Sequence, residues 1–83
     1  MDELKARRDN IAITIMNIKR AKTRTDLQKM LKNIDNTFSD ISRELVECRR
    51  IHKETAHYQK LIENITNSIE TVEQLLVFAA LMN

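Results

Sequence analysis

The sequence predicts an all-α protein, built as an antiparallel helical hairpin or a three-helix arrangement with coiled-coil-like seams. Its 83 residues contain no glycine and no proline, the residues that most often interrupt regular structure. Apolar residues recur every three or four positions almost from end to end, which is the spacing of one helix face. Chains this small usually need disulfides, a metal or oligomerisation for stability, and a single cysteine excludes an internal disulfide.

The first predicted helix covers residues 3–22. Ile13 and Met16 lie off its apolar stripe, which widens the apolar face and suits a helix that contacts more than one neighbour. The alternating segment 11–15 would also fit a short strand, although the sequence offers no second strand to pair with it. The stripe itself has the four-and-three spacing of a heptad seam and consists of Leu4, Ile11, Ile15 and Ile18.

A helix boundary is predicted near residues 23–26. Thr25 and Gln28 have the spacing of a capping box, in which each side chain binds the backbone N–H of the other residue. The heptad frame also breaks here, because the first stripe would place a core position at Thr25 whereas the second stripe starts at Leu27. The basic residues just before this boundary would then lie at the negative end of the first helix dipole.

The second predicted helix covers residues 26–50. It crosses residues 33–40, which are rich in turn-forming side chains, but the unbroken heptad spacing favours helix over a kink or a break. The step from Cys48 to Ile51 is three residues, and this shift of frame predicts a bend or loop near 50–56. The apolar stripe consists of Leu27, Leu31, Ile34, Phe38, Ile41, Leu45 and Cys48.

The third predicted helix covers residues 55–81, and one long helix from residue 26 to the end is the alternative. Residues 75–82 are apolar on every side of the helix, so a partner, a self-contact or the other helices must cover them. This run is too short to span a membrane, and no basic residue flanks it for binding to a lipid surface. The stripe of this helix consists of Tyr58, Ile62, Ile65, Ile69, Val72, Leu76 and Ala79.

These stripes predict a non-enzymatic structural or scaffold protein, a small coiled-coil subunit that forms a homo-oligomer or joins other helical chains. We interpret residues 1–83 as one helical domain. Leucine at a with isoleucine at d favours bundles of three or more helices, and an intramolecular three-helix core is the alternative. The predicted interface residues are Leu27, Leu31, Ile34, Phe38, Ile41, Leu45, Ile62, Ile65, Ile69, Val72 and Leu76.

Charge is unevenly distributed along the chain. The net charge is +2, but residues 1–32 carry +5 and residues 33–83 carry −3, which suits antiparallel packing of one end on the other. An alternative function is that of a small adaptor or regulator that binds an acidic partner or nucleic acid through its basic first third. Nucleic acid is the less favoured partner, because no aromatic residue there could stack on a base. The basic patch consists of Lys19, Arg20, Lys22 and Arg24.

The sequence predicts no catalytic residue, no cofactor and no metal site. Without glycine the chain has neither a phosphate-binding loop nor a nucleophile elbow. Cys48 and His52 share a helix face and could form half of a zinc site between two helices, but no other ligand-type residue is placed to join them. We interpret Cys48 as a buried thiol. With one cysteine and neither a secretory nor a membrane-spanning segment expected, the predicted location is cytoplasmic, with the nucleus as an alternative.

Overall fold

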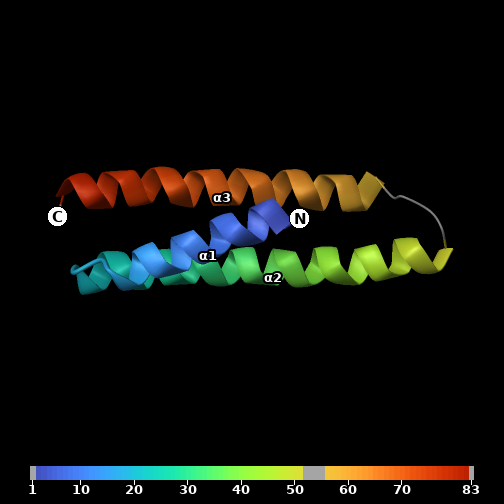
Figure 1. The fold of residues 1–83 in the computed structure, drawn as a ribbon, viewed down its shortest axis with the longest axis horizontal. Helices are drawn as coiled ribbons and strands as arrows, with labels where there is room; N and C mark the ends of the chain where they lie inside the picture. Colours follow the sequence, from blue (N-terminus) through green and yellow to red (C-terminus); the bar gives the residue numbers. More distant parts are fainter. Residues whose placement is uncertain (1, 52–55, 83) are drawn as a thin grey trace.

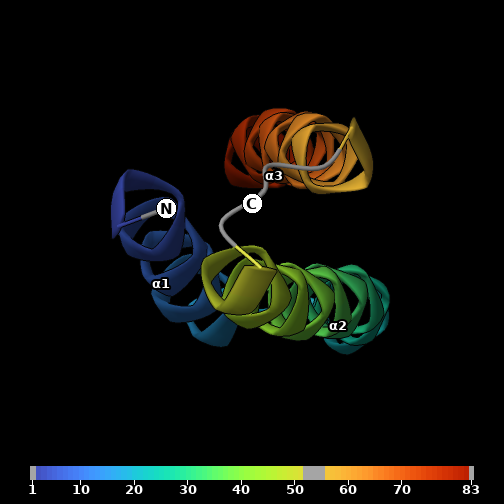
Figure 2. The ribbon, with the colours of Figure 1, turned by 90° about the vertical axis from the view of Figure 1, so that its right-hand side faces the viewer.

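Three α-helices, arranged up, down and up, form an elongated bundle of about 49 × 17 × 15 Å (Figure 1). The computed structural model describes residues 2–51 and 56–82. All three pairs of helices pack against each other, with the second antiparallel to the other two (Figures 1 and 2). The predicted all-α, three-helix fold is confirmed. The helices are α1 (Asp2–Met16), α2 (Ala21–Ile51) and α3 (Ala56–Met82).

The core lies along the seam between the three helices and is made of the predicted stripes. Isoleucine dominates it, and among the residues that the structure describes no polar or charged residue is buried. Complete burial of each large apolar side chain contributes about 1.5–3 kcal/mol, which is opposed by the entropy of ordering the chain. The core cluster comprises Ile11, Ile15, Ile18, Leu27, Ile34, Phe38, Ile41, Ile65, Ile69, Val72, Leu76 and Ala79.

The predicted boundary at residues 23–26 was wrong, because α1 ends at Met16 and α2 begins at Ala21. The last turn of α1 tightens through i→i+3 hydrogen bonds, in which the N–H groups of Asn17 and Ile18 donate to carbonyls three residues earlier, both at 3.1 Å. Ile18 is buried in this junction. The apolar stripe therefore continues through the turn while the helix does not, which is why the stripe placed the boundary too late.

The capping box predicted at Thr25 is also absent. The Thr25 hydroxyl donates to the Ala21 carbonyl oxygen at 2.9 Å, a bond within the body of a helix. The backbone bond from the Arg24 N–H to the Arg20 carbonyl oxygen, at 2.9 Å, places Arg20 at the start of α2. The polar spacing of a cap thus occurs one turn inside this helix, where the hydroxyl already has a backbone acceptor.

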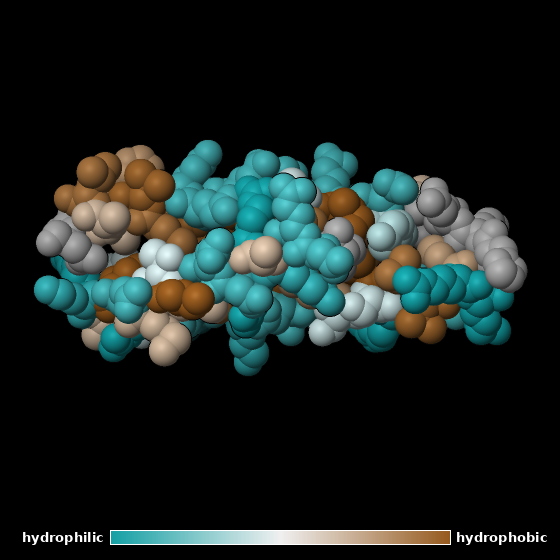
Figure 3. All heavy atoms as spheres, in the orientation of Figure 1, coloured by the Kyte–Doolittle hydropathy of each residue, from teal (hydrophilic) through white to brown (hydrophobic). Residues whose placement is uncertain are grey.

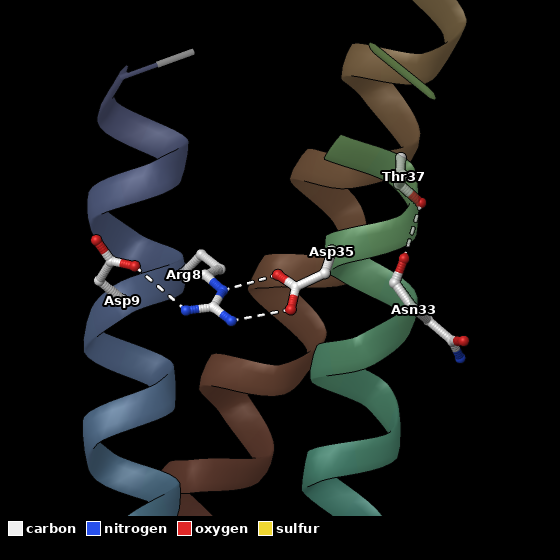
Figure 4. A network of polar contacts seen from close by, with 5 residues as sticks. All are labelled: Arg8, Asp9, Asn33, Asp35 and Thr37. Atoms are coloured by element: carbon white, nitrogen blue, oxygen red, sulfur yellow. Dashed lines mark hydrogen bonds and ion pairs between the residues drawn. The ribbon is translucent and has the colours of Figure 1, made fainter. Parts of the chain in front are cut away.

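The remaining boundaries follow the periodicity. α2 continues as helix through residues 33–40, where the Thr37 hydroxyl donates to the Asn33 carbonyl oxygen at 3.1 Å, as Figure 4 also shows. Residues 11–15 lie within α1, so the alternative strand interpretation was wrong. α2 ends at Ile51 and α3 begins at Ala56 beside it in the opposite direction, which excludes one long helix from residue 26. The predicted first residue of the third helix, residue 55, lies outside the described residues.

The helices differ in length, and this gives the bundle two unlike ends. α1 has 15 residues and α2 has 31, so α1 covers only part of the hairpin that α2 and α3 form (Figure 1). We call the end that holds the α1–α2 turn and the last turns of α3 the junction end. We call the other end, where α2 and α3 lie together beyond the start of α1, the hairpin end.

Candidate protein interface

The predicted interface residues lie mostly inside the chain. Most of them are buried in the three-helix core, while Leu31, Leu45 and Ile62 are half-buried. These side chains pack against other helices of the same chain, although Leu27 and Leu76 also line surface hollows. The intramolecular core, which the sequence left as the alternative, accounts for their apolar character. The buried members are Leu27, Ile34, Phe38, Ile41, Ile65, Ile69, Val72 and Leu76.

Two consecutive arginines fasten α1 to both of its neighbours. Successive helical residues point about 100° apart, so Arg7 faces α3 while Arg8 faces α2. The Arg7 guanidinium donates two hydrogen bonds to the Glu73 carboxylate, one of them from Nε to Oε2 at 3.1 Å. This hydrogen bonding lowers the pKa of Glu73 and raises the pKa of Arg7. The pair therefore fixes the position of α1 along α3.

Arg8 makes the matching contact with α2 (Figure 4). Its Nε donates to Oδ1 of Asp35 at 2.8 Å and its Nη2 donates to Oδ2 at 2.9 Å, while Nη1 lies 3.3 Å from Oδ1 of Asp9. The hydrogen bonds to Asp35 raise the pKa of Arg8. Two parallel N–H···O bonds to one carboxylate also set orientation. As the charge distribution suggested, basic residues near the beginning of the chain pair with acidic residues later in it. The packing of α1 on α3 is parallel, because α2 lies between them in the sequence and reverses the chain direction twice.

The largest exposed apolar side chains of α3 gather at the junction end. We define the apolar tip as Leu75, Val77, Phe78 and Leu81, which are 38%, 62%, 64% and 79% exposed. Figure 3 shows apolar surface over this end of α3. Of the apolar run predicted to need a cover, Leu76 and Ala79 face the core. The other helices thus cover one side of this run and leave the apolar tip in solvent.

Two hollows border the apolar tip. The first, of about 180 Å³, lies between the α1–α2 turn and α3, where Arg20 and Thr23 contribute to an otherwise apolar lining of Ile18, Leu27, Leu75, Phe78 and Ala79. The second, of about 330 Å³, lies between α1 and α3 and is lined by Asn10, Ile11, Thr14, Glu73, Leu76, Val77 and Ala80. The ridge of large apolar side chains can insert into a partner, and the hollows on either side of it can receive side chains from that partner.

The predicted basic patch lies at the same end. Lys19 and Arg20 are exposed in the α1–α2 turn, and Lys22 and Arg24 follow in the first turn of α2. The sequence placed these residues at the negative end of a helix dipole. Lys22 and Arg24 lie instead at the positive N-terminal end of α2, while Lys19 and Arg20 lie in the turn between the end of α1 and the start of α2. This junction favours an acidic neighbour.

Acidic residues border the other side of the apolar tip. Glu70 and Glu73 line a surface groove together with Gln74 and Val77. Glu73 is held by Arg7, whereas Glu70 lies one turn earlier on the exposed side of α3. The acidic flank therefore precedes the apolar tip along α3, while the basic α1–α2 turn lies beside the tip across the first hollow.

Two further expectations from the sequence concern metal binding and membrane crossing. Cys48 is buried, and its proposed zinc partner His52 lies outside the described residues. Within residues 2–51 and 56–82, no three His, Cys, Asp or Glu side chains are grouped to hold a metal ion. None of the helices in these ranges is both long and apolar enough to cross a membrane.

Comparison with protein-family models, with curated proteins and with solved structures gave no match. The function is therefore argued from the apolar tip, its two hollows and its charged flanks.

Proposed function

We propose that this protein is a non-enzymatic assembly module, a small helical subunit that binds another protein through the apolar tip at its junction end. The observation that carries the proposal is the exposure of Val77, Phe78 and Leu81 next to one another on a helix whose heptad stripe is buried at Leu76 and Ala79. Contiguous apolar surface of this kind is typical of sites that bind other proteins.

The chemistry of the apolar tip suits a protein partner. Phe78 offers a large and rigid side chain, the type that dominates the energy of many interfaces when it is buried in a partner. The hollow beside it is lined mainly by apolar side chains, with Arg20 at its border. Buried apolar contacts would supply affinity, while the charged flanks would orient the partner and speed its approach.

The basic patch supports a second candidate, an electrostatic adaptor that binds an acidic protein. Four basic side chains beside the N-terminus of α2 concentrate positive potential in one place. Reversal of Lys19, Arg20, Lys22 and Arg24 to glutamate separates the two functions. An electrostatic adaptor should lose its partner and show steep salt dependence, whereas binding led by the apolar tip should persist with a slower association rate.

Site-specific crosslinking in the source cells tests the assembly proposal. A photo-reactive benzoylphenylalanine replaces Phe78 in one variant and Lys29, which is exposed on the body of α2, in the control. We expect a protein adduct of defined mass from position 78 and none from position 29. Equal labelling from both positions, or no adduct from position 78, would contradict the proposed function.

A further inference from the structure

We infer that the partner of the apolar tip is a second copy of this chain, bound antiparallel about a two-fold axis that passes near Val77 and Phe78. This inference rests on the proposed function and specifies its partner. It is carried by two features of the junction end: a surface shape that can complement itself, and opposite charges on the two sides of the apolar tip.

The shape of the apolar tip allows self-pairing. A two-fold interface uses the same patch on both copies, so the patch must contain both projecting and hollow parts. Val77, Phe78 and Leu81 project, and hollows lie on both sides of them. Phe78 of one copy can pack against the hollow that borders Phe78 of the other copy. Both copies then bury side chains that are more than half exposed in the single chain.

The charges select the antiparallel orientation. Along α3 the apolar tip is preceded by Glu70 and Glu73, whereas the basic α1–α2 turn lies beside the tip, where Arg20 and Phe78 line the same hollow. Antiparallel pairing about the apolar tip turns the basic side of each copy towards the acidic flank of the other. Parallel pairing would place like charges together, which is unfavourable.

The absence of basic residues after Lys60 strengthens this selection. The described part of α3 beyond that residue carries Glu63, Glu70 and Glu73 as its charged side chains. The positive partner of this flank therefore comes from another helix or another chain. Glu73 already has Arg7, so Glu70 is the carboxylate that a second copy would contact.

A charge-reversal experiment tests the arrangement. One variant carries Lys19→Glu and Arg20→Glu, the other carries Glu70→Lys and Gln74→Lys, and Lys29→Glu serves as the matched control. Sedimentation equilibrium between about 1 μM and about 1 mM gives the dimer dissociation constant of each. Each reversed variant should dimerise about tenfold more weakly than the unaltered chain, because two like-charge contacts replace two opposite-charge contacts. The control should change the constant by less than about twofold.

Mixing the two reversed variants provides the decisive measurement. In the mixed dimer, one contact joins the new glutamates to the new lysines and the symmetry-related contact keeps its original charges. We expect the mixture to regain the dissociation constant of the unaltered chain within about threefold. Circular dichroism of each variant checks that the helices are intact.

Two results would overturn this inference: an unaltered chain that stays monomeric throughout the concentration range, or a mixture that fails to regain dimerisation. The crosslink at position 78 keeps this failure distinct from failure of the proposed function. If the adduct contains a different protein and the chain is monomeric in solution, a second copy is excluded as the partner. The proposed function as an assembly module then still stands. An adduct with twice the mass of the chain supports both.

Discussion

The two ends of this bundle have similar sequence patterns and different burial. At the junction end α1 packs into the groove between α2 and α3, and Ile11, Ile15 and Val72 are each 1% exposed. At the hairpin end, among described residues 42–51 and 56–64, Cys48 is the one that is buried, while Leu45, Tyr58, Leu61 and Ile62 are half-buried. Heptad spacing places a side chain on the seam, but a third helix is needed to exclude water from it.

The ion pairs differ in the same way. Near α1 two pairs join different helices, Arg7 to Glu73 and Arg8 to Asp35, in addition to the contact of Arg8 with Asp9 within α1. At the hairpin end the pairs of Arg43 with Asp40 and of Arg50 with Glu47 lie within α2, three residues apart. Pairs within a helix support local structure by a few tenths of a kcal/mol, whereas pairs between helices also fix how the helices are placed.

The largest expected effect is the difference in stability between two aspartate substitutions in α2, one at a buried position and one at an exposed position near the hairpin end. Ile41→Asp places a charge at a site that is 0% exposed, and we expect it to destabilise the fold by about 4 kcal/mol or more. Val46→Asp, at a site that is 64% exposed, should change stability by about 0.5 kcal/mol or less. Urea denaturation followed by circular dichroism measures both. Similar losses from the two variants would contradict the described burial.

A second pair of substitutions compares the two ends directly. Ile15→Ala at the junction end removes a side chain enclosed by three helices, and we expect a loss of about 3 kcal/mol. Leu61→Ala at the hairpin end removes a half-buried side chain, and we expect a loss of about 1 kcal/mol. Denaturant midpoints at equal m-values give the comparison. A larger loss from the leucine variant would show that the hairpin end is the better packed one.

A smaller effect concerns the contact that holds α1 on α2. The double-mutant cycle of Arg8→Ala and Asp35→Ala should give a coupling free energy of about 0.5–1 kcal/mol, because both side chains are partly exposed and solvent screens them. Hydrogen exchange should become faster for the α1 amides in either variant and stay unchanged at the hairpin end. A coupling energy near zero would mean that core packing alone positions α1.

The smallest expected effect is a pH dependence. The pKa of Glu73 is lowered in the folded chain by its hydrogen bonds from Arg7, so this carboxylate stabilises the fold above its unfolded pKa. That contribution is lost as the pH falls through the folded pKa. The stability difference between the unaltered chain and Glu73→Gln should therefore be present at about pH 7 and decrease as the pH falls below the usual pKa of glutamate and through the lowered folded pKa. A stability difference that does not change with pH would mean that the charge of the Glu73 carboxylate is not its cause.

Much of the fold could be predicted because the apolar spacing is regular. The stripes that contain Ile34 and Ile69 identified helices and their buried faces, and the frame shift after Cys48 indicated where the second helix ends. The turn after Met16 could not be predicted in the same way, since Ile18 continues the stripe beyond the end of the helix. Without glycine or proline to mark the turn, the capping-type spacing at Thr25 was the stronger local signal, and it was misleading.

The apolar stripes left open whether they pack inside one chain or between two. An apolar stripe has the same appearance whether it packs inside one chain or between two, so Ile41 and Ile65 fitted both interpretations. The run at residues 75–82 was the better indication of exposed apolar surface, because a helix that is apolar on every side cannot be covered by two neighbours. The arginine contacts of α1 escaped detection, since pairing Arg7 with Glu73 depends on helix direction and axial position.

Composition and periodicity by themselves determined that this chain is helical and which side chains need burial, because those properties depend on local backbone preferences and on solvent exclusion from one helix face. Only the tertiary structure decided that three helices of the same chain bury those stripes, that α1 leaves one end of the hairpin uncovered, and that Val77, Phe78 and Leu81 stay exposed. These outcomes depend on the relative lengths and directions of packed helices, which residue spacing within one helix does not specify.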